Sequence, residues 1–148
     1  MKSITIILCT LFSTVAIAQD PKSEQLIKHR RAAFTLMSSY FSRILNVVDG
    51  EVDYDKHSVV QNAKTVEMLS KLPWVGFAPG TEFGDTRAKP EIWFEEDDFE
   101  KLAVDMQNKV RELRVTAETG NAAQVKTAFI TARKSCGACH DRYRKKAE

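Results

Sequence analysis

Four stretches of the chain, 26–48, 59–72, 99–117 and 125–143, carry apolar side chains at intervals of three and four residues. This spacing constrains the fold more than any other feature. Because residues three and four apart share one face of an α-helix, each stretch predicts an amphipathic helix. No stretch shows the alternation of a strand, and no internal repeat is visible. The residues expected to begin or end the helices are Ser23, Asp49–Gly50, Asp53–Asp55, Pro73, Glu95–Asp98, Gly120 and Asn121.

Four amphipathic helices with mostly short links predict an all-α fold, an antiparallel four-helix bundle. The link between the second and third helices is the exception. The range 73–91 holds three of the four prolines and three of the six glycines, so it is expected to form a long loop.

The first 18 residues have the pattern of a signal peptide. Lys2 gives a positive start, the run from Ile4 to Phe12 is mostly apolar, and Ala16-Ile17-Ala18 matches the small-x-small cleavage pattern. The run is too short to span a bilayer. We therefore expect cleavage after Ala18, export to the periplasm and a single domain over 19–148. No later segment has transmembrane length.

The charge balance is nearly neutral, with 22 basic and 20 acidic residues and a formal net charge of +2. No clustered basic face indicates nucleic-acid binding. The basic tail fits cations placed at a helix C-terminus, with a docking patch as the alternative interpretation. Its members are Arg142, Arg144, Lys145 and Lys146.

The sequence Cys136-Gly137-Ala138-Cys139-His140 is the attachment signature of c-type haem. Cysteines three apart lie on one helix face, so Cys136 and Cys139 can each form a thioether with a vinyl group of one porphyrin. His140 can then reach the iron from the same face. The small Gly137 and Ala138 let the porphyrin approach the backbone. One covalently held haem c is therefore the expected cofactor, with His140 as its iron ligand.

Three other uses of these cysteines fit less well. Export makes a disulfide conceivable, but the following histidine argues against it. A zinc site needs more ligands nearby, and His29 and His57 are distant in sequence. A redox dithiol usually accompanies a βα pattern that this chain lacks.

The long loop holds the aromatic residues Trp74 and Phe77, and Trp93 follows just beyond it. Aromatic side chains in so long a loop predict that it folds back onto an apolar surface. That surface is either the end of the bundle or the edge of the haem.

The haem motif lies near the C-terminus, on the last expected helix. In this position the chain resembles cytochrome c′, the class II c-type cytochromes, over about 23–146. The resemblance is carried by Lys28-x-Arg30, Leu72-Pro73-Trp74-x-x-Phe77-x-x-Gly80-Thr81, Pro90-Glu91-Ile92-Trp93 and Cys136-x-x-Cys139-His140-x-x-Tyr143-Arg144.

The resemblance implies roles for further residues. Arg144 would lie beside the proximal His140. Arg30 would bind a haem propionate, with Arg31 beside it. Asp85 would contact the haem periphery, and Phe34 would face the iron on its distal side.

Phenylalanine cannot bind iron, so Phe34 predicts five-coordinate, high-spin iron in a crowded apolar pocket. The expected neighbours of Phe34 are Trp74, Phe77 and Phe99. The alternative is a low-spin electron carrier in which Met37, three residues after Phe34, is the sixth ligand. A methionine in this position more often fills a gap in a core.

An open apolar position favours nitric oxide and carbon monoxide, since dioxygen benefits from distal hydrogen bonds that Phe34 cannot give. The expected function is a gas-binding protein, an electron carrier, or both. The sequence shows no distal His and Arg pair that could cleave a peroxide bond as in a peroxidase. We therefore expect no enzymatic activity. The resemblance further implies a homodimer through the first two helices, to which the outward residues Val47, Val60 and Met68 could contribute. An electron carrier would also have a redox partner protein.

Overall fold

The computed structural model describes residues 20–146, and the expected signal peptide, 1–18, lies outside them. The elements in chain order are α1 (Pro21–Val48), α2 (Lys56–Leu69), the short 3-10 helices η1 (Pro73–Phe77) and η2 (Pro90–Trp93), α3 (Glu96–Thr119) and α4 (Ala122–Tyr143). Residues 20–146 contain no strand, and only an isolated bridge joins Ala88 to Arg144. The all-α prediction is confirmed.

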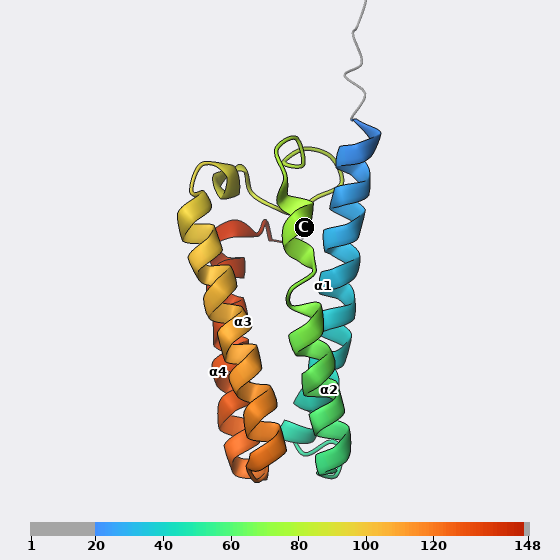
Figure 1. Ribbon diagram of the computed structural model, residues 1–148, viewed down its shortest axis with the longest axis vertical. Helices are drawn as coiled ribbons and strands as arrows, with labels where there is room; N and C mark the ends of the chain where they lie inside the picture. The colour runs from blue at the N-terminus through green and yellow to red at the C-terminus, as the bar shows by residue number, and fades with distance from the viewer. Residues whose placement is uncertain (1–19, 147–148) are drawn as a thin grey trace, which may run out of the picture.

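The four α-helices form an antiparallel bundle, as predicted (Figure 1). α1 pairs with α2 and α3 pairs with α4. The two pairs meet where α2 packs on α3, and α1 contacts α4 less extensively. The long connection lies at one end of the bundle, next to the C-terminal end of α4. We call this the upper end, as it is drawn in Figure 1.

Most of the expected helix boundaries are confirmed. Asp55 and Asn121 cap α2 and α4 through their side chains, and Gly120 is the C-cap of α3. Asp49 ends α1, and Gly50 follows in the left-handed region with φ of +80°.

The predicted start of α1 is wrong. Asp20, rather than Ser23, is the N-cap, and its carboxylate accepts a hydrogen bond from the backbone N–H of Ser23 at 3.3 Å. Pro21 occupies the first helical turn, where its missing N–H is no loss, so the helix begins before Ser23.

α2 is half as long as α1, which shapes the upper end. At a rise of 1.5 Å per residue the 28 residues of α1 span about 42 Å and the 14 of α2 about 21 Å. The helix stops at Leu69, before the expected end at Pro73, and Pro73 instead begins η1. Consequently η1 packs against the upper part of α1, where α2 no longer reaches (Figure 1).

All four α-helices contribute to one buried apolar core, which favours folding by removing this surface from water. Its members are Ile44, Val59, Ala63, Val66, Met106, Val110, Leu113, Ala117, Val125, Phe129 and Ala132.

Val47 and Val60 were expected to point outward, and this is wrong. Both are half-buried and pack against the core, because the apolar faces of α1 and α2 are wider than a single row of side chains. Met68 does point outward and is 60% exposed.

No helix within residues 20–146 combines the length and the apolar character needed to cross a bilayer.

Candidate haem site

The last two turns of α4 present the two cysteines and the histidine. Cys136 and Cys139 are free thiols, and both are half-buried. Cys136 packs against the core, as do Met37 and Trp74 from α1 and η1. Cys136 therefore lies on the inner side of α4 and Cys139 is half-buried one turn away, whereas the side chain of His140 is exposed.

The protonation of these groups follows from their surroundings. Burial raises the pKa of Cys136, and it raises that of Cys139 to about 11. Partial desolvation lowers the pKa of His140, and the positive charge of Arg144 lowers it further. The site thus holds two neutral thiols and an imidazole biased to its neutral form, which is the form that binds a metal.

The donor set fits a c-type haem better than a metal ion held by protein alone. Within residues 20–146 no three His, Cys, Asp or Glu side chains gather in a way that could hold a metal ion. A Cβ added at Gly137 would meet no atom within 4 Å, so the backbone between the cysteines is open to a bulky group. Two thiols and one imidazole on a single helix end match the chemistry of thioether attachment and axial ligation.

An aromatic cluster links this end of α4 to α1. Tyr143 on α4 meets Phe99 of α3 edge-on, with ring centroids 5.4 Å apart. Phe99 contacts Phe77 at 4.9 Å and Trp74 at 5.8 Å. Phe34 packs edge-on against Trp74 at 6.0 Å and Phe77 at 6.3 Å.

Two of the three expected neighbours of Phe34 thus touch it directly, and Phe99 joins through them. The cluster also includes Trp93, which contacts Phe77. The long loop therefore folds back onto the upper end of the bundle, as its aromatic residues predicted.

The side chain of Arg30 is buried, with 2% exposure, and makes four hydrogen bonds to the long connection. Its Nη1 donates to the carbonyl of Gly76 at 2.6 Å and to Oγ1 of Thr81 at 2.9 Å. Its Nη2 donates to the carbonyl of Thr81 and the hydroxyl of Thr86, both at 2.7 Å. The guanidinium also lies 4.5 Å from the ring centroid of Phe77. Arg30 therefore fastens α1 to the long connection.

The charge of Arg30 has no close counter-ion. Burial lowers the pKa of Arg30 to about 10, an effect that Glu82 partly offsets. Within residues 20–146 no carboxylate lies within 4.0 Å of the guanidinium. In the same part of the chain, Oε2 of Glu82 is buried without a hydrogen-bond partner. The four Nη bonds leave the Nε–H of Arg30 for a further acceptor.

Arg31 and Asp85 form an ion pair with each other at the surface, and Arg31 also donates to the backbone carbonyl of Asp85. The structure thus brings together the two residues that the resemblance placed beside the haem. Both side chains are more than half exposed, so either can turn to another partner at little cost.

The C-terminal end of α4 is held by residues that the sequence analysis did not assign. The hydroxyl of Tyr143 donates to Glu95 Oε2 at 2.9 Å, and Arg142 donates to the same oxygen at 2.6 Å. Arg142 also reaches Asp98 at 2.9 Å. The hydrogen bonds that Glu95 accepts from Tyr143 and Arg142 lower the pKa of Glu95. The acidic residues at the start of α3 therefore hold α4, and they also stabilise the positive end of the helix dipole of α3.

Beyond α4 the chain turns back along the long connection. Arg144 is the C-cap, and its N–H donates to the carbonyl of His140 at 3.0 Å. The Lys145 N–H donates to the carbonyl of Arg87 at 2.8 Å, and the Arg87 side chain donates to the Lys145 carbonyl at 2.8 and 3.0 Å. Partial desolvation lowers the pKa of Arg144, and the nearby charge of Arg87 lowers it further.

A family model described as Cytochrome C' matches residues 25–144. The chain belongs to the cytochrome c′ family. This family binds haem c, which agrees with the donor set on α4.

Curated relatives in the cytochrome c′ family match over nearly their whole length. Cytochrome c' of Alcaligenes xylosoxydans xylosoxydans is 41% identical over 128 residues, covering 86% of this chain and 99% of the relative. Cytochrome c' of Rubrivivax gelatinosus is 34% identical over 129 residues, covering 86% of this chain and 100% of the relative.

Solved cytochrome c′ structures share the fold. The crystal structure of the Rubrivivax gelatinosus protein has a TM-score of 0.80 at 33% identity, covering 83% of this chain and 97% of that one. A nitric oxide complex of a mutant cytochrome c′ from Alcaligenes xylosoxidans has a TM-score of 0.81 at 39% identity, covering 86% and 99%. Cytochrome c′ from Shewanella frigidimarina has a TM-score of 0.82 at 32% identity, covering 86% and 99%.

Proposed function

We propose that this chain is an exported, monohaem c-type cytochrome whose five-coordinate iron takes nitric oxide and carbon monoxide and exchanges electrons. The observation that carries the proposal is the pairing of two free thiols and an imidazole on α4 with a cluster of aromatic side chains at the same end of the bundle. When bound, such a haem supplies an open iron position for small neutral diatomics and a one-electron redox couple.

Cys136 and Cys139 would each hold one vinyl carbon of the porphyrin through a thioether. The packing of Cys136 against the apolar core and the half-buried position of Cys139 support this role. His140 would bind the iron through its neutral imidazole, and Arg144 at the helix end would disfavour protonation of that ring.

Arg30 would bind a haem propionate through its remaining Nε–H. A propionate would supply the counter-charge that the buried guanidinium lacks within residues 20–146. Arg31 and Asp85 lie at the same connection and would contact the periphery of the cofactor from the solvent side.

Phe34 would close the distal side. Its ring packs on Trp74 and Phe77 and offers neither an iron ligand nor a hydrogen bond to a bound molecule. It would therefore exclude water and leave room only for small neutral ligands. The nitric oxide complex of a mutant Alcaligenes cytochrome c′ supports nitric oxide as such a ligand by similarity.

The alternative is a low-spin electron carrier in which Met37 is the sixth ligand. Met37 is half-buried and packs against the apolar core, which favours its use as a packing residue. The comparisons do not favour this alternative.

Absorption spectra of the purified, exported protein test the proposal. We expect haem absorption that survives denaturation, a mass increased by one haem over residues 19–148, and high-spin spectra in both oxidation states. Nitric oxide added to the ferrous form should shift the spectrum stoichiometrically. A sharp low-spin spectrum that Met37→Leu abolishes would favour the alternative. Recovery of the protein with residues 1–18 still attached would contradict export by cleavage.

We also propose that two copies associate through α1 and α2. Met68 on α2 and Leu36 on α1 are 60% and 51% exposed, and apolar side chains this exposed at one pair of helices support an interface. The mass of the protein in solution tests this.

A further inference from the structure

The outward face of α4 carries a row of cations around His140. Lys126, Ile130, Arg133, Gly137 and His140 follow one another at steps of four and three residues, so they share one face of the helix. Arg144, at the C-cap, continues the row. The charged members are exposed, and Ile130 between them is 41% exposed. The face thus combines positive charge with an accessible apolar centre.

The folded-back tail adds further cations to this row. Hydrogen bonds between Arg87 and Lys145 bring the tail against the long connection, and the bridge between Ala88 and Arg144 holds it there. Within residues 20–146, no carboxylate lies within 4.0 Å of the basic groups at positions 87, 126, 133, 144 and 145. Asp141, next to His140, is the acid on this part of α4.

Arg142 does not belong to the row. It was grouped with the basic tail from the sequence, but its guanidinium faces α3 and is neutralised by Glu95 and Asp98. On the side toward α3 the cation of α4 is paired, whereas the cations on the outward side have no carboxylate within 4.0 Å in residues 20–146. A helix-dipole role alone does not account for cations as far from the helix end as Lys126 and Arg133.

We propose that this face, formed by Lys126, Ile130, Arg133, His140, Arg144 and Lys145, docks an acidic patch on a redox partner protein and is where electrons enter and leave. The proposal rests on the proposed function, since it requires a haem bound at His140. An interface with a charged rim and an apolar centre is typical of protein recognition, and opposite charges speed and orient the encounter. His140, the proposed iron ligand, belongs to the same row, so a partner docked there would lie near the iron.

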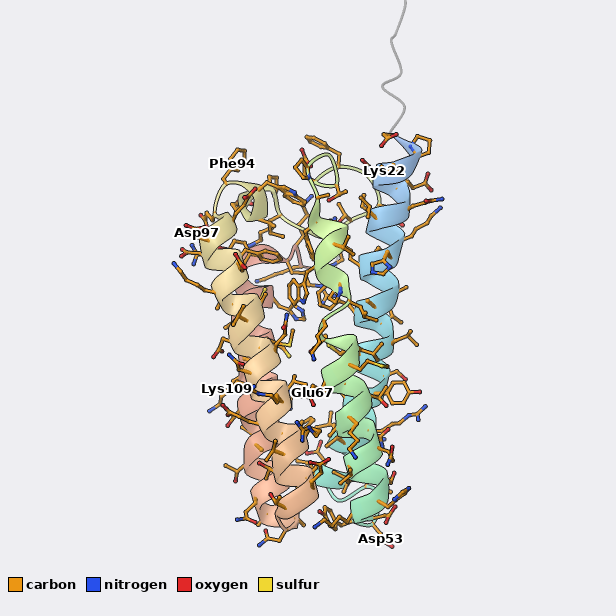
Figure 2. All side chains as sticks on the ribbon, viewed as in Figure 1. Lys22, Asp53, Glu67, Phe94, Asp97 and Lys109 are labelled. Atoms are coloured by element: carbon orange, nitrogen blue, oxygen red, sulfur yellow. The ribbon has the colours of Figure 1, made fainter. Side chains whose placement is uncertain are left out.

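A protein partner fits this surface better than an anionic membrane. A flat bilayer that contacted His140 and Arg144 at the upper end of the bundle would also meet the acidic start of α3. Phe94 and Asp97 project outward there (Figure 2). A compact acidic patch can instead contact the row on α4 without facing those carboxylates.

Charged electron-transfer reagents test the proposal on the intact holoprotein. The variant Arg133→Glu with Lys145→Glu reverses two cations of the face. The control, Lys56→Glu with Arg111→Glu, reverses two exposed cations elsewhere that also lack a carboxylate within 4.0 Å, and changes the net charge equally. Lys56 begins α2, at the end of the bundle where Asp53 is labelled in Figure 2. Stopped-flow absorbance follows oxidation of the ferrous protein by ferricyanide, an anion, and by tris-phenanthroline cobalt(III), a cation.

At low ionic strength we expect the α4 variant to slow oxidation by ferricyanide by about three- to tenfold and to speed oxidation by the cobalt complex, because local charge steers the encounter. The control should change both rates much less, and 1 M salt should remove the difference, because the screening length then falls to about 3 Å. Equal changes in the oxidation rates of the two variants would overturn the proposal. It would also be overturned if the wild-type protein sedimented with phosphatidylglycerol vesicles and the α4 variant did not. In each case an intact haem spectrum leaves the proposed function standing, whereas a haem-free protein contradicts that function instead.

Discussion

Arg30 and Thr81, 51 residues apart in the chain, are joined by two hydrogen bonds from the guanidinium, one to the Thr81 hydroxyl at 2.9 Å and one to its carbonyl at 2.7 Å. Both residues are buried. The pair fixes the long connection to α1 at the level where α2 has ended. The aromatic cluster depends on this attachment, because Trp74 and Phe77 lie on the same connection.

Replacing Arg30 by lysine should destabilise the protein by about 2–4 kcal/mol, since an ammonium cannot satisfy four acceptors set for a planar guanidinium and leaves buried acceptors unpaired. Chemical denaturation followed by circular dichroism measures this. Arg31→Gln is the control, because it removes an exposed ion pair and should change stability by less than about 1 kcal/mol. Equal stability of Arg30→Lys and wild type would contradict the role given to Arg30.

Replacing Gly76 by alanine should cost about 1–3 kcal/mol by overpacking. A Cβ there would lie 2.6 Å from Cβ of Arg30 and 2.7 Å from the carbonyl oxygen of Leu26, and a backbone atom cannot move aside as a side chain can. Thermal unfolding measures the loss. Val75→Ala, an exposed change in the same short helix, should have little effect, and comparable losses in the two variants would argue against a close approach at Gly76.

Acid should weaken the hold of α3 on α4. Hydrogen bonds from Tyr143 and Arg142 hold the pKa of Glu95 below its ordinary value of 4.5. A carboxyl whose pKa is lower in the folded state contributes stability that is present above about pH 4.5 and is lost as the pH falls through the folded pKa. The unfolding free energy, measured between pH 6 and pH 3, should therefore fall less steeply in Glu95→Gln. Glu96→Gln, an exposed neighbour, should keep the wild-type slope, and a wild-type slope in Glu95→Gln would exclude this contribution.

Removing the ring of Phe34 should open the distal side. In Phe34→Ala we expect the association rate of carbon monoxide with the ferrous protein to rise by about tenfold, because steric access to the iron governs ligand entry. Flash photolysis or stopped-flow mixing measures the rate. Met37→Leu is the matched control on the same helix and should leave both the rate and the spectrum unchanged. An unchanged rate in Phe34→Ala would mean that another group gates the site.

A charge placed at Met68 should separate the proposed dimer. Met68→Asp would bury a carboxylate in the α1–α2 interface, so analytical ultracentrifugation should show a monomer. Val52→Asp alters another exposed apolar residue, in the turn after α1, and should leave the mass unchanged. A dimer that persists in Met68→Asp would place the interface elsewhere.

Much of the fold could be predicted because it depends on local chemistry. Asp55, Gly120 and Asn121 terminate helices through their own conformational preferences or side-chain caps, and these preferences are readable in sequence. The prediction of Ser23 as the N-cap of α1 was wrong because Asp20 and Pro21 provide a helix start one turn earlier. The prediction that Val47 and Val60 point outward was wrong because the width of an apolar face depends on how closely the neighbouring helices pack.

The non-local contacts of the site could not be read in the same way. The pattern around Arg30 does not reveal that its donors meet Gly76, Thr81 and Thr86, since those partners are brought near only by the path of the connection. The acidic residues at the start of α3 suggested a helix dipole, and only the antiparallel pairing with α4 brings Glu95 to Tyr143.

The shortness of α2 divides the molecule into two parts with different opportunities for change. Where all four helices run side by side, almost any alteration in side-chain volume is felt by three neighbours at once. Alongside the upper part of α1, an irregular segment stands in for the missing helical turns, and single contacts from Arg30 and the aromatic side chains hold it there. A substitution between Pro73 and Trp93 is therefore expected to alter the surroundings of Phe34 while leaving the packing at the opposite end intact.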